Sequence, residues 1–314
     1  MLDRRKLLAL LSAGAAMGVL SDAFAAPLRL VFVHGRGQQG QDPALLKAAW
    51  LDALKQGAQK VGAPLPSGLD VAFPYYGDAL DRFTQDFATA SEAHARGGNV
   101  SDQFLLFQAA VADELRLRAG VSDAELDAEY GPNPKPKGPL NWEWVHAILR
   151  TLDRRGGGMG QAALETFTRD VFLYLNRVVV RDEINRIVAG ELTEAPTVVV
   201  GHSLGSVVAY NVLRSDQRGL RVPLYLTVGC PLGIRAIRDN LVPLRFPQPV
   251  GAWYNAFDTR DVVALYPLDG ANFPVTPAIE NYGMVDNQTD NRHGIAGYLD
   301  DVFVAKRILD AVGR

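Results

Sequence analysis

Two kinds of apolar pattern alternate along this chain. Continuous apolar runs, typical of parallel strands buried on both faces, occur at residues 28–33, 69–76, 197–201, 222–229 and 251–257. Stretches with apolar residues three or four positions apart, which predict amphipathic helices, stand between or after most of these runs. Strands that alternate with helices predict an α/β fold, in which helices flank a mainly parallel sheet.

The segment from about residue 78 to residue 190 shows helical patterns and no convincing strand pattern. Ser122 and Glu125 have the spacing of a helix-capping box, and Asn141 precedes a further helical pattern. Prolines between residues 132 and 139 predict a stiff, non-helical connector. We therefore predict a helical cap, about residues 78–190, inserted into the sheet domain.

The start of the chain has the pattern of an export signal. Arg4, Arg5 and Lys6 precede an apolar run over residues 7–20, and a small-x-small sequence follows at residues 23–25. This pattern predicts a signal peptide over residues 1–25 and a mature, periplasmic or secreted domain over residues 26–314. The paired arginines are similar to those of a twin-arginine signal; a general secretory signal and an uncleaved membrane anchor are the alternatives.

Composition narrows the classes of partner. A formal net charge of −3 gives no basic field for nucleic acid, so nucleic-acid binding is not expected. Cys230 is the single cysteine, which excludes an intrachain disulfide and a multi-cysteine metal site. No stable membrane span is expected in residues 26–314, and the sequence does not indicate an oligomeric state.

Residues 201–205 read Gly-His-Ser-Leu-Gly, which is the G-x-S-x-G pattern of a nucleophile on a sharp turn. The motif follows a predicted strand and opens a predicted helix. In so tight a turn, side chains beside Ser203 would clash, which accounts for Gly201 and Gly205. The helix N-terminus behind the serine favours a developing negative charge. Ser203 is therefore the candidate nucleophile; the alternative is an ordinary strand-to-helix turn with a buried serine.

In this setting the motif resembles the nucleophile elbow of the α/β-hydrolase superfamily, in particular of its lipase- and esterase-like members. The resemblance covers roughly residues 28–78 and 190–312, and it excludes the predicted cap. It implies acyl transfer from a small or lipid-like ester through a Ser-acid-His triad in that chain order. That chemistry uses side chains alone, so no metal or organic cofactor is expected.

The base of such a triad is a histidine placed after the last strand. Of the five histidines, His293 alone lies in a polar loop just before the closing helix predicted at residues 295–312. Two others lie in the predicted cap, His202 lies inside the elbow, and His34 lies in the loop after the first strand. We therefore expect His293 to be the general base; a solvated loop histidine is the alternative.

The acid is expected after the strand at residues 251–257, where Asp258 and Asp261 stand close together. Asp261 precedes two apolar residues, Val262 and Val263, which is similar to the acid loop of lipase-like hydrolases. The resemblance therefore places the role on Asp261. Asp258 is the alternative acid, although its position favours a turn or capping carboxylate beside Arg260.

An oxyanion site is expected in the loop after the first strand. The sequence there is His34 followed by Gly35, Arg36 and Gly37, which resembles the His-Gly oxyanion loop of the same superfamily. The resemblance implies that the main-chain N–H groups of Arg36 and Leu204 bind the oxyanion. Gly35 and Gly37 allow the main chain to approach a substrate closely.

Two other functions fit parts of the sequence. Residues 35–40 spell G-x-G-x-x-G, the fingerprint of a dinucleotide-binding oxidoreductase. However, Asp42 and Pro43 start the helix after the last glycine and put a carboxylate where phosphate should lie, and no ribose-binding acid stands near Lys60. The third function is that of a catalytically inactive hydrolase scaffold that only binds, which no particular residue favours.

Four aromatic residues of the predicted cap bear on substrate size. They either line an apolar acyl pocket above Ser203 or form the core of the cap itself, and the helical spacing fits both: Phe104, Phe107, Trp142 and Trp144. An acyl pocket would suit an ester of medium chain length.

Overall fold

The computed structural model describes residues 29–94, 100–132, 136–154 and 161–313. The signal peptide predicted over residues 1–25 lies outside these ranges, so it stays a prediction.

A six-stranded sheet organises the described residues, and all its strands are parallel. The fold is therefore the predicted α/β architecture, and it is compatible with an α/β-hydrolase fold. The strands, in the spatial order β2-β1-β3-β4-β5-β6, are β1 (Arg29–Val33), β2 (Asp70–Ala72), β3 (Thr197–His202), β4 (Tyr225–Val228), β5 (Trp253–Ala256) and β6 (Glu280–Tyr282).

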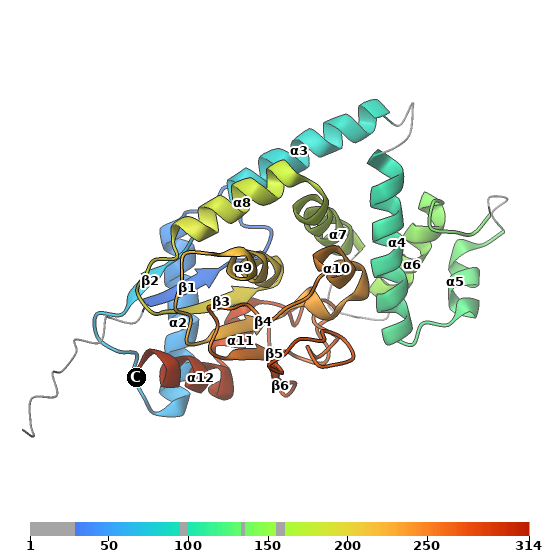
Figure 1. The fold of residues 1–314 in the computed structure, drawn as a ribbon. Helices are drawn as coiled ribbons and strands as arrows, with labels where there is room; N and C mark the ends of the chain where they lie inside the picture. The colour runs from blue at the N-terminus through green and yellow to red at the C-terminus, as the bar shows by residue number, and fades with distance from the viewer. Residues whose placement is uncertain (1–28, 95–99, 133–135, 155–160, 314) are drawn as a thin grey trace, which may run out of the picture.

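Helices cover both faces of the sheet (Figure 1). On one face lie α2 (Pro43–Val61), α11 (Ile295–Leu299) and α12 (Val302–Val312), over Leu30 and Phe32 of β1. On the other face lies α9 (Leu204–Ser215), over Val31 and Val33, with α8 (Val178–Gly190) packed on it. Alternate residues of β1 therefore enter different cores, which explains why its sequence is apolar at every position from Leu30 to Val33.

The sequence predicted some element boundaries and missed others. Asp42 caps α2 as expected, because its carboxylate accepts the N–H of Ala44 at 2.7 Å, and Pro43 is the first helical residue. The single closing helix predicted at residues 295–312 is wrong. The chain forms α11 and then α12, and Asp301 caps α12 by accepting the N–H groups of Phe303 and Val304.

Between β2 and β3 the described residues form helices and no strand. We call the set α3–α8 the helical insert. Its members before α8 are α3 (Gly77–His94), α4 (Val100–Arg118), α5 (Asp123–Tyr130), α6 (Trp142–Arg154) and α7 (Gln161–Asn176). The predicted capping box is present at α5, where Ser122 and Glu125 bond reciprocally. Three shorter helices follow β4: η1 (Pro231–Gly233), α10 (Arg235–Arg238) and η2 (Asp239–Leu241).

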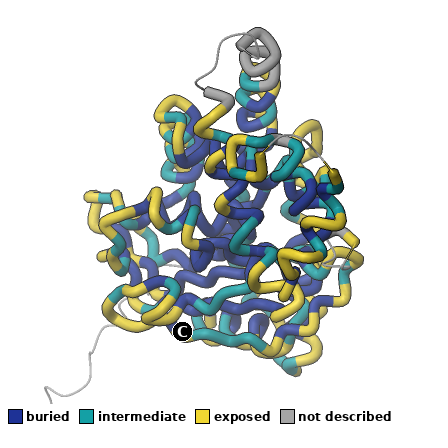
Figure 2. Tube along the Cα trace, turned by 90° about the vertical axis from the view of Figure 1, so that its right-hand side faces the viewer, coloured by how far each residue is buried: buried dark blue, intermediate teal, exposed yellow. Residues whose placement is uncertain are grey.

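The insert shares its core with one face of the sheet. Figure 2 shows buried chain that continues from the sheet into the surrounding helices. Phe104 and Phe107 both pack against Phe172 of α7, at ring-centroid distances of 5.4 and 5.6 Å, and Trp144 packs against Tyr130 at 5.3 Å. Phe104, Phe107 and Trp144 therefore pack into the core of the insert, which is one of the two predicted arrangements; the side chain of Trp142 lies outside the described part of the structure.

Among the described helices, none combines the length and the apolar character needed to cross a membrane.

Candidate active site

Two of the predicted site segments, residues 35–37 and Ser203, follow the neighbouring strands β1 and β3. Because β2 and β3 lie on opposite sides of β1, the connections that leave β1 and β3 diverge. In open α/β sheets, ligands bind in the crevice formed outside the carboxyl ends of the strands at such a point. Ser203 directly follows β3, and residues 35–37 follow β1.

Ser203 lies on a sharp turn. Its φ of 54° and ψ of −129° are unusual for a residue with a side chain, and α9 begins at the next residue. A Cβ on Gly201 would lie 2.7 Å from Ser206 Cα, and a Cβ on Gly205 would lie 2.1 Å from the Val33 carbonyl oxygen. Both glycines are therefore required by close main-chain approach, as the sequence predicts.

The Ser203 hydroxyl is buried and unpaired. The residue is 1% exposed, and its Oγ makes no hydrogen bond within the described part of the chain. A buried hydroxyl normally has a partner, because leaving it unpaired costs about 1–3 kcal/mol. An unpaired hydroxyl on a strained residue is a feature typical of functional sites.

The His293 ring is held by Asp261. Nδ1 lies 2.7 Å from Asp261 Oδ2, and the hydroxyl of Tyr298 donates to the same oxygen at 2.6 Å. The other carboxylate oxygen, Oδ1, accepts the N–H of Val263 at 2.9 Å, and Asp261 is fully buried. Since the carboxylate accepts at Nδ1, that nitrogen carries the proton, and Nε2 of His293 presents its lone pair.

Asp258, the alternative acid, bonds to other groups. Its Oδ1 accepts the N–H of Arg260 at 2.8 Å, and its Oδ2 accepts the N–H of Asn287 at 3.0 Å. The guanidinium of Arg292 lies 3.7 Å from Oδ2. The structure thus brings Asp261 against the His293 ring, whereas Asp258 orders the loop that leads to His293.

His293 lies beside the elbow. Its carbonyl oxygen accepts the Nε2–H of His202 at 2.8 Å, and the two rings lie 4.8 Å apart between centroids. A Cβ added to Gly229, at the end of β4, would lie 3.0 Å from the His293 ring. The ring therefore lies at the carboxyl ends of β3 and β4, beside His202 of the elbow, and no hydrogen bond joins it to the Ser203 hydroxyl in this structure.

The loop after β1 lies against the serine. A Cβ on Gly35 would be 2.9 Å from Ser203 Cβ and 3.4 Å from Oγ, so a side chain at residue 35 would displace the Ser203 side chain. Gly37 has a φ of 74°, which favours glycine. The loop and the elbow thus approach each other at Gly35 and Ser203. Arg36 and Leu204, whose main-chain N–H groups are the expected oxyanion donors, directly follow these two residues.

Two of the histidines that the sequence set aside, His34 and His202, have structural partners. Burial lowers the pKa of His34 to about 4, and His34 Nε2 accepts the N–H of Tyr76 at 3.1 Å, which fixes its neutral tautomer. Burial, with the neighbouring His293, lowers the pKa of His202 to about 3. Both rings are neutral at pH 7, and neither is placed to take a proton from Ser203.

The glycine loop has its own carboxylate partners. Asp42 caps α2, and the N–H of Gly40 donates to Asp78 at 2.7 Å. Acidic groups therefore bond the main-chain donors on which a dinucleotide phosphate would depend.

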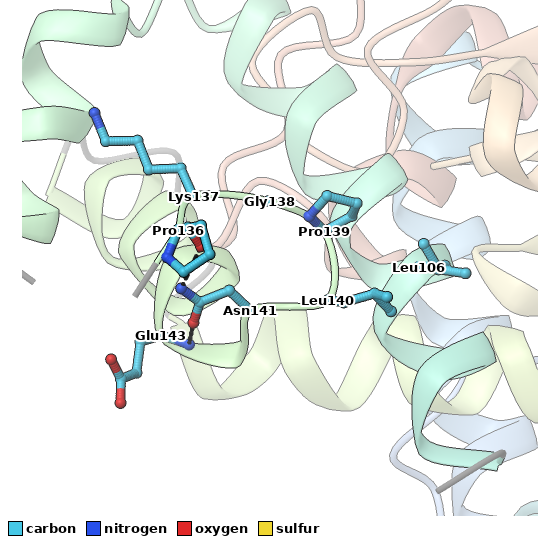
Figure 3. A pocket seen from close by; sticks show the side chains of 8 residues that line it. All are labelled: Leu106, Pro136, Lys137, Gly138, Pro139, Leu140, Asn141 and Glu143. Carbon is cyan, nitrogen blue, oxygen red and sulfur yellow. Dashed lines mark hydrogen bonds between the residues drawn. The ribbon is translucent and has the colours of Figure 1, made fainter. Parts of the chain in front are cut away.

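A pocket lies in the helical insert (Figure 3). Its cavity volume is about 630 Å³, and it is lined by Leu106 and by residues of the connector before α6. None of the candidate site residues lines it. The described residues also contain no cluster of three or more histidine, cysteine or acidic side chains suited to a metal ion.

Two residues that contact the site were not predicted. Tyr298 stands in an apolar helical pattern, and Asp170 of α7, which pairs with Arg36, stands in the insert. Neither carries a motif, and each reaches the site only through the fold.

Comparisons with protein-family models, with curated proteins and with solved structures find no match to this chain.

Proposed function

We propose that this chain is a serine hydrolase of the α/β-hydrolase type, which cleaves carboxylic esters through an acyl-enzyme on Ser203. The observation that carries the proposal is the unpaired, buried hydroxyl of Ser203 at a strained turn, together with an imidazole that a buried carboxylate orients and that packs on the adjacent residue, His202. Asp261 supports the ring, and His293 Nε2 is the nitrogen left to accept a proton.

The mechanism follows from these groups. Ser203 Oγ attacks the ester carbonyl carbon while His293 Nε2 takes the hydroxyl proton, and the N–H groups of Arg36 and Leu204 bind the oxyanion. The intermediate collapses and expels the alcohol, which receives the proton from His293. A water molecule, deprotonated by the same nitrogen, then attacks the acyl-enzyme; the bond to Ser203 Oγ breaks, His293 returns the proton to that oxygen, and the carboxylic acid is released.

The proposal requires a hydrogen bond between Ser203 and His293 that this structure does not contain. Catalytic hydrogen bonds are often long or misaligned without substrate and tighten when it binds. We expect the bond to form in the substrate complex.

The substrate is proposed only as an ester, small or lipid-like. Of the aromatic residues that suggested an acyl pocket, Phe104, Phe107 and Trp144 pack into the insert core, so they do not support a particular chain length. Export to the periplasm or beyond, with residues 26–314 as the mature chain, is proposed from residues 4–25 alone.

Turnover of p-nitrophenyl esters by purified residues 26–314 tests the proposal. Ser203→Ala and His293→Ala are each expected to lower kcat on the order of 10⁶-fold, as in other hydrolases whose triad acts as a unit. Full turnover by Ser203→Ala would refute it. An inactive wild type that enhances NADPH fluorescence would favour the dinucleotide alternative, and one that does neither would favour an inactive binding scaffold.

A further inference from the structure

The loop after β1 is tied to the helical insert through one side chain. Arg36 Nε donates to Asp170 Oδ2 at 3.0 Å, across 134 residues of sequence. Asp170 is 4% exposed, and its other oxygen accepts hydrogen bonds from Arg169 Nε at 3.1 Å and Nη2 at 3.0 Å. A single buried carboxylate therefore holds two guanidinium groups, one from the loop and one from its own helix.

Other hydrogen bonds hold this loop at residue 36 and on either side of it. The carbonyl oxygen of Arg36 accepts a hydrogen bond from Gln38 Nε2 at 3.2 Å. At the far end, the hydroxyl of Tyr75 donates to the Gln38 carbonyl, and Asp78 accepts the N–H of Gly40, both at 2.7 Å. At the near end, His34 Nε2 accepts the N–H of Tyr76, and His34 Nδ1 donates to the Gly35 carbonyl at 2.6 Å. Glycines flank residue 36, so the main chain there is intrinsically free to rotate.

The peptide group between Gly35 and Arg36 is held on its carbonyl side by His34 Nδ1, and on the other side the Arg36 side chain ties the residue to Asp170. We propose that Asp170 is a positioning residue, which fixes the main-chain N–H of Arg36 toward the oxyanion by holding the Arg36 guanidinium. The inference rests on the proposed function. It gives the helical insert a part in catalysis, although the insert supplies no group that touches the reacting atoms.

Energetic considerations favour position over stability as the role of this ion pair. Burying charged groups costs desolvation energy that the pairing largely offsets, so a buried ion pair is a weak source of folding stability. Geometry, in contrast, has a large effect on rate. A displacement of 1 Å at an active site costs about 10²-fold, and loss of one oxyanion donor costs about 10²–10³-fold in kcat.

Four variants test the inference: Arg36→Gln, Asp170→Asn, the double variant, and Arg169→Gln as the matched control. Arg36→Gln keeps the main-chain N–H, so any loss reports its position and not its removal. Arg169→Gln removes the other guanidinium from the same carboxylate without touching the loop. The readouts are kcat and KM for a p-nitrophenyl ester, with the thermal midpoint of each variant.

We expect Arg36→Gln and Asp170→Asn each to lower kcat by about 10- to 100-fold with little change in KM, since the oxyanion forms only after substrate binds. The double variant should lose no more than either single variant, because both break one interaction. Arg169→Gln should stay within about twofold of the wild-type kcat.

Wild-type kcat in Arg36→Gln would overturn the inference, as would losses that add in the double variant. If Arg36→Gln and Arg169→Gln lose kcat equally, and these losses follow the decreases in their thermal midpoints, the role of the ion pair is structural and the inference is overturned too. Should Asp170→Asn not fold, the pair Arg36→Gln and Arg169→Gln decides, since both side chains are partly exposed. If Ser203→Ala turns over like the wild type, the proposed function fails and the inference with it. If turnover depends on Ser203 and Arg36→Gln leaves it unchanged, the inference is refuted while the proposed function stands.

Discussion

Replacement of Asp261 by asparagine separates the two candidate acids. Asp261 Oδ1 accepts the N–H of Val263, and Oδ2 accepts His293 Nδ1 and the hydroxyl of Tyr298. An asparagine that keeps its oxygen on Val263 must turn its NH₂ group toward His293. The ring then has to accept at Nδ1 and carry its proton on Nε2, where it cannot take the proton of Ser203.

The expected loss is therefore that of a wrong tautomer in an intact site. It amounts to about 10⁴-fold in kcat, the effect of the corresponding change in a Ser-His-Asp triad. KM should change little, because Asp261 is fully buried and has no surface for substrate. The assay is steady-state hydrolysis of a p-nitrophenyl ester, with circular dichroism to verify folding.

Asp258→Asn is the matched control. Asp258 is 1% exposed and bonds to Arg260 and to the Asn287 N–H, so the change should cost about 1–3 kcal/mol of folding stability and leave kcat within about tenfold. The opposite result, a large kcat loss in Asp258→Asn and a small one in Asp261→Asn, would refute the assignment of the acid.

Three further predictions follow from the same contacts. Tyr298→Phe removes a donor to the Asp261 carboxylate, so kcat should fall by about 10- to 100-fold in the ester assay; an unchanged kcat would contradict a role in holding the acid. Burial lowers the pKa of His34 to about 4 and that of His202 to about 3, whereas an unfolded histidine titrates near 6.5. The unfolded chain therefore binds more protons as pH falls below about 6.5, and urea unfolding should show stability decreasing toward pH 4, with a smaller slope in His34→Gln. Gly205→Ala places a Cβ 2.1 Å from the Val33 carbonyl oxygen and should prevent folding; a folded variant by circular dichroism would disprove the close approach of α9 to β1.

The central strands and the elbow were predictable because their signals are local. β1 and β3 are buried on both faces and therefore read as continuous apolar runs, and the glycines around Ser203 mark a turn that admits no other side chains. β6 escaped prediction because it has three residues and none of them is fully buried. The break between α11 and α12 depends on one cap, Asp301, within a pattern that is otherwise helical.

The partners of the site residues could not be predicted, because they depend on long-range packing. Asp258 and Asp261 are three positions apart, and only the fold shows that one faces a histidine ring and the other faces arginines. Tyr298 reaches Asp261 across 37 residues, and Asp170 reaches Arg36 across 134. Neither contact leaves a spacing that a sequence pattern could reveal.

The site of covalent labelling by a fluorophosphonate tests the central claim most directly. Only an activated hydroxyl forms the phosphonyl adduct, and mass spectrometry of the digested protein locates it. We predict a single adduct on the peptide that contains Ser203, lost in Ser203→Ala and strongly slowed in His293→Ala. An adduct on another residue, or labelling that persists in Ser203→Ala, would contradict the assignment of this serine as the nucleophile.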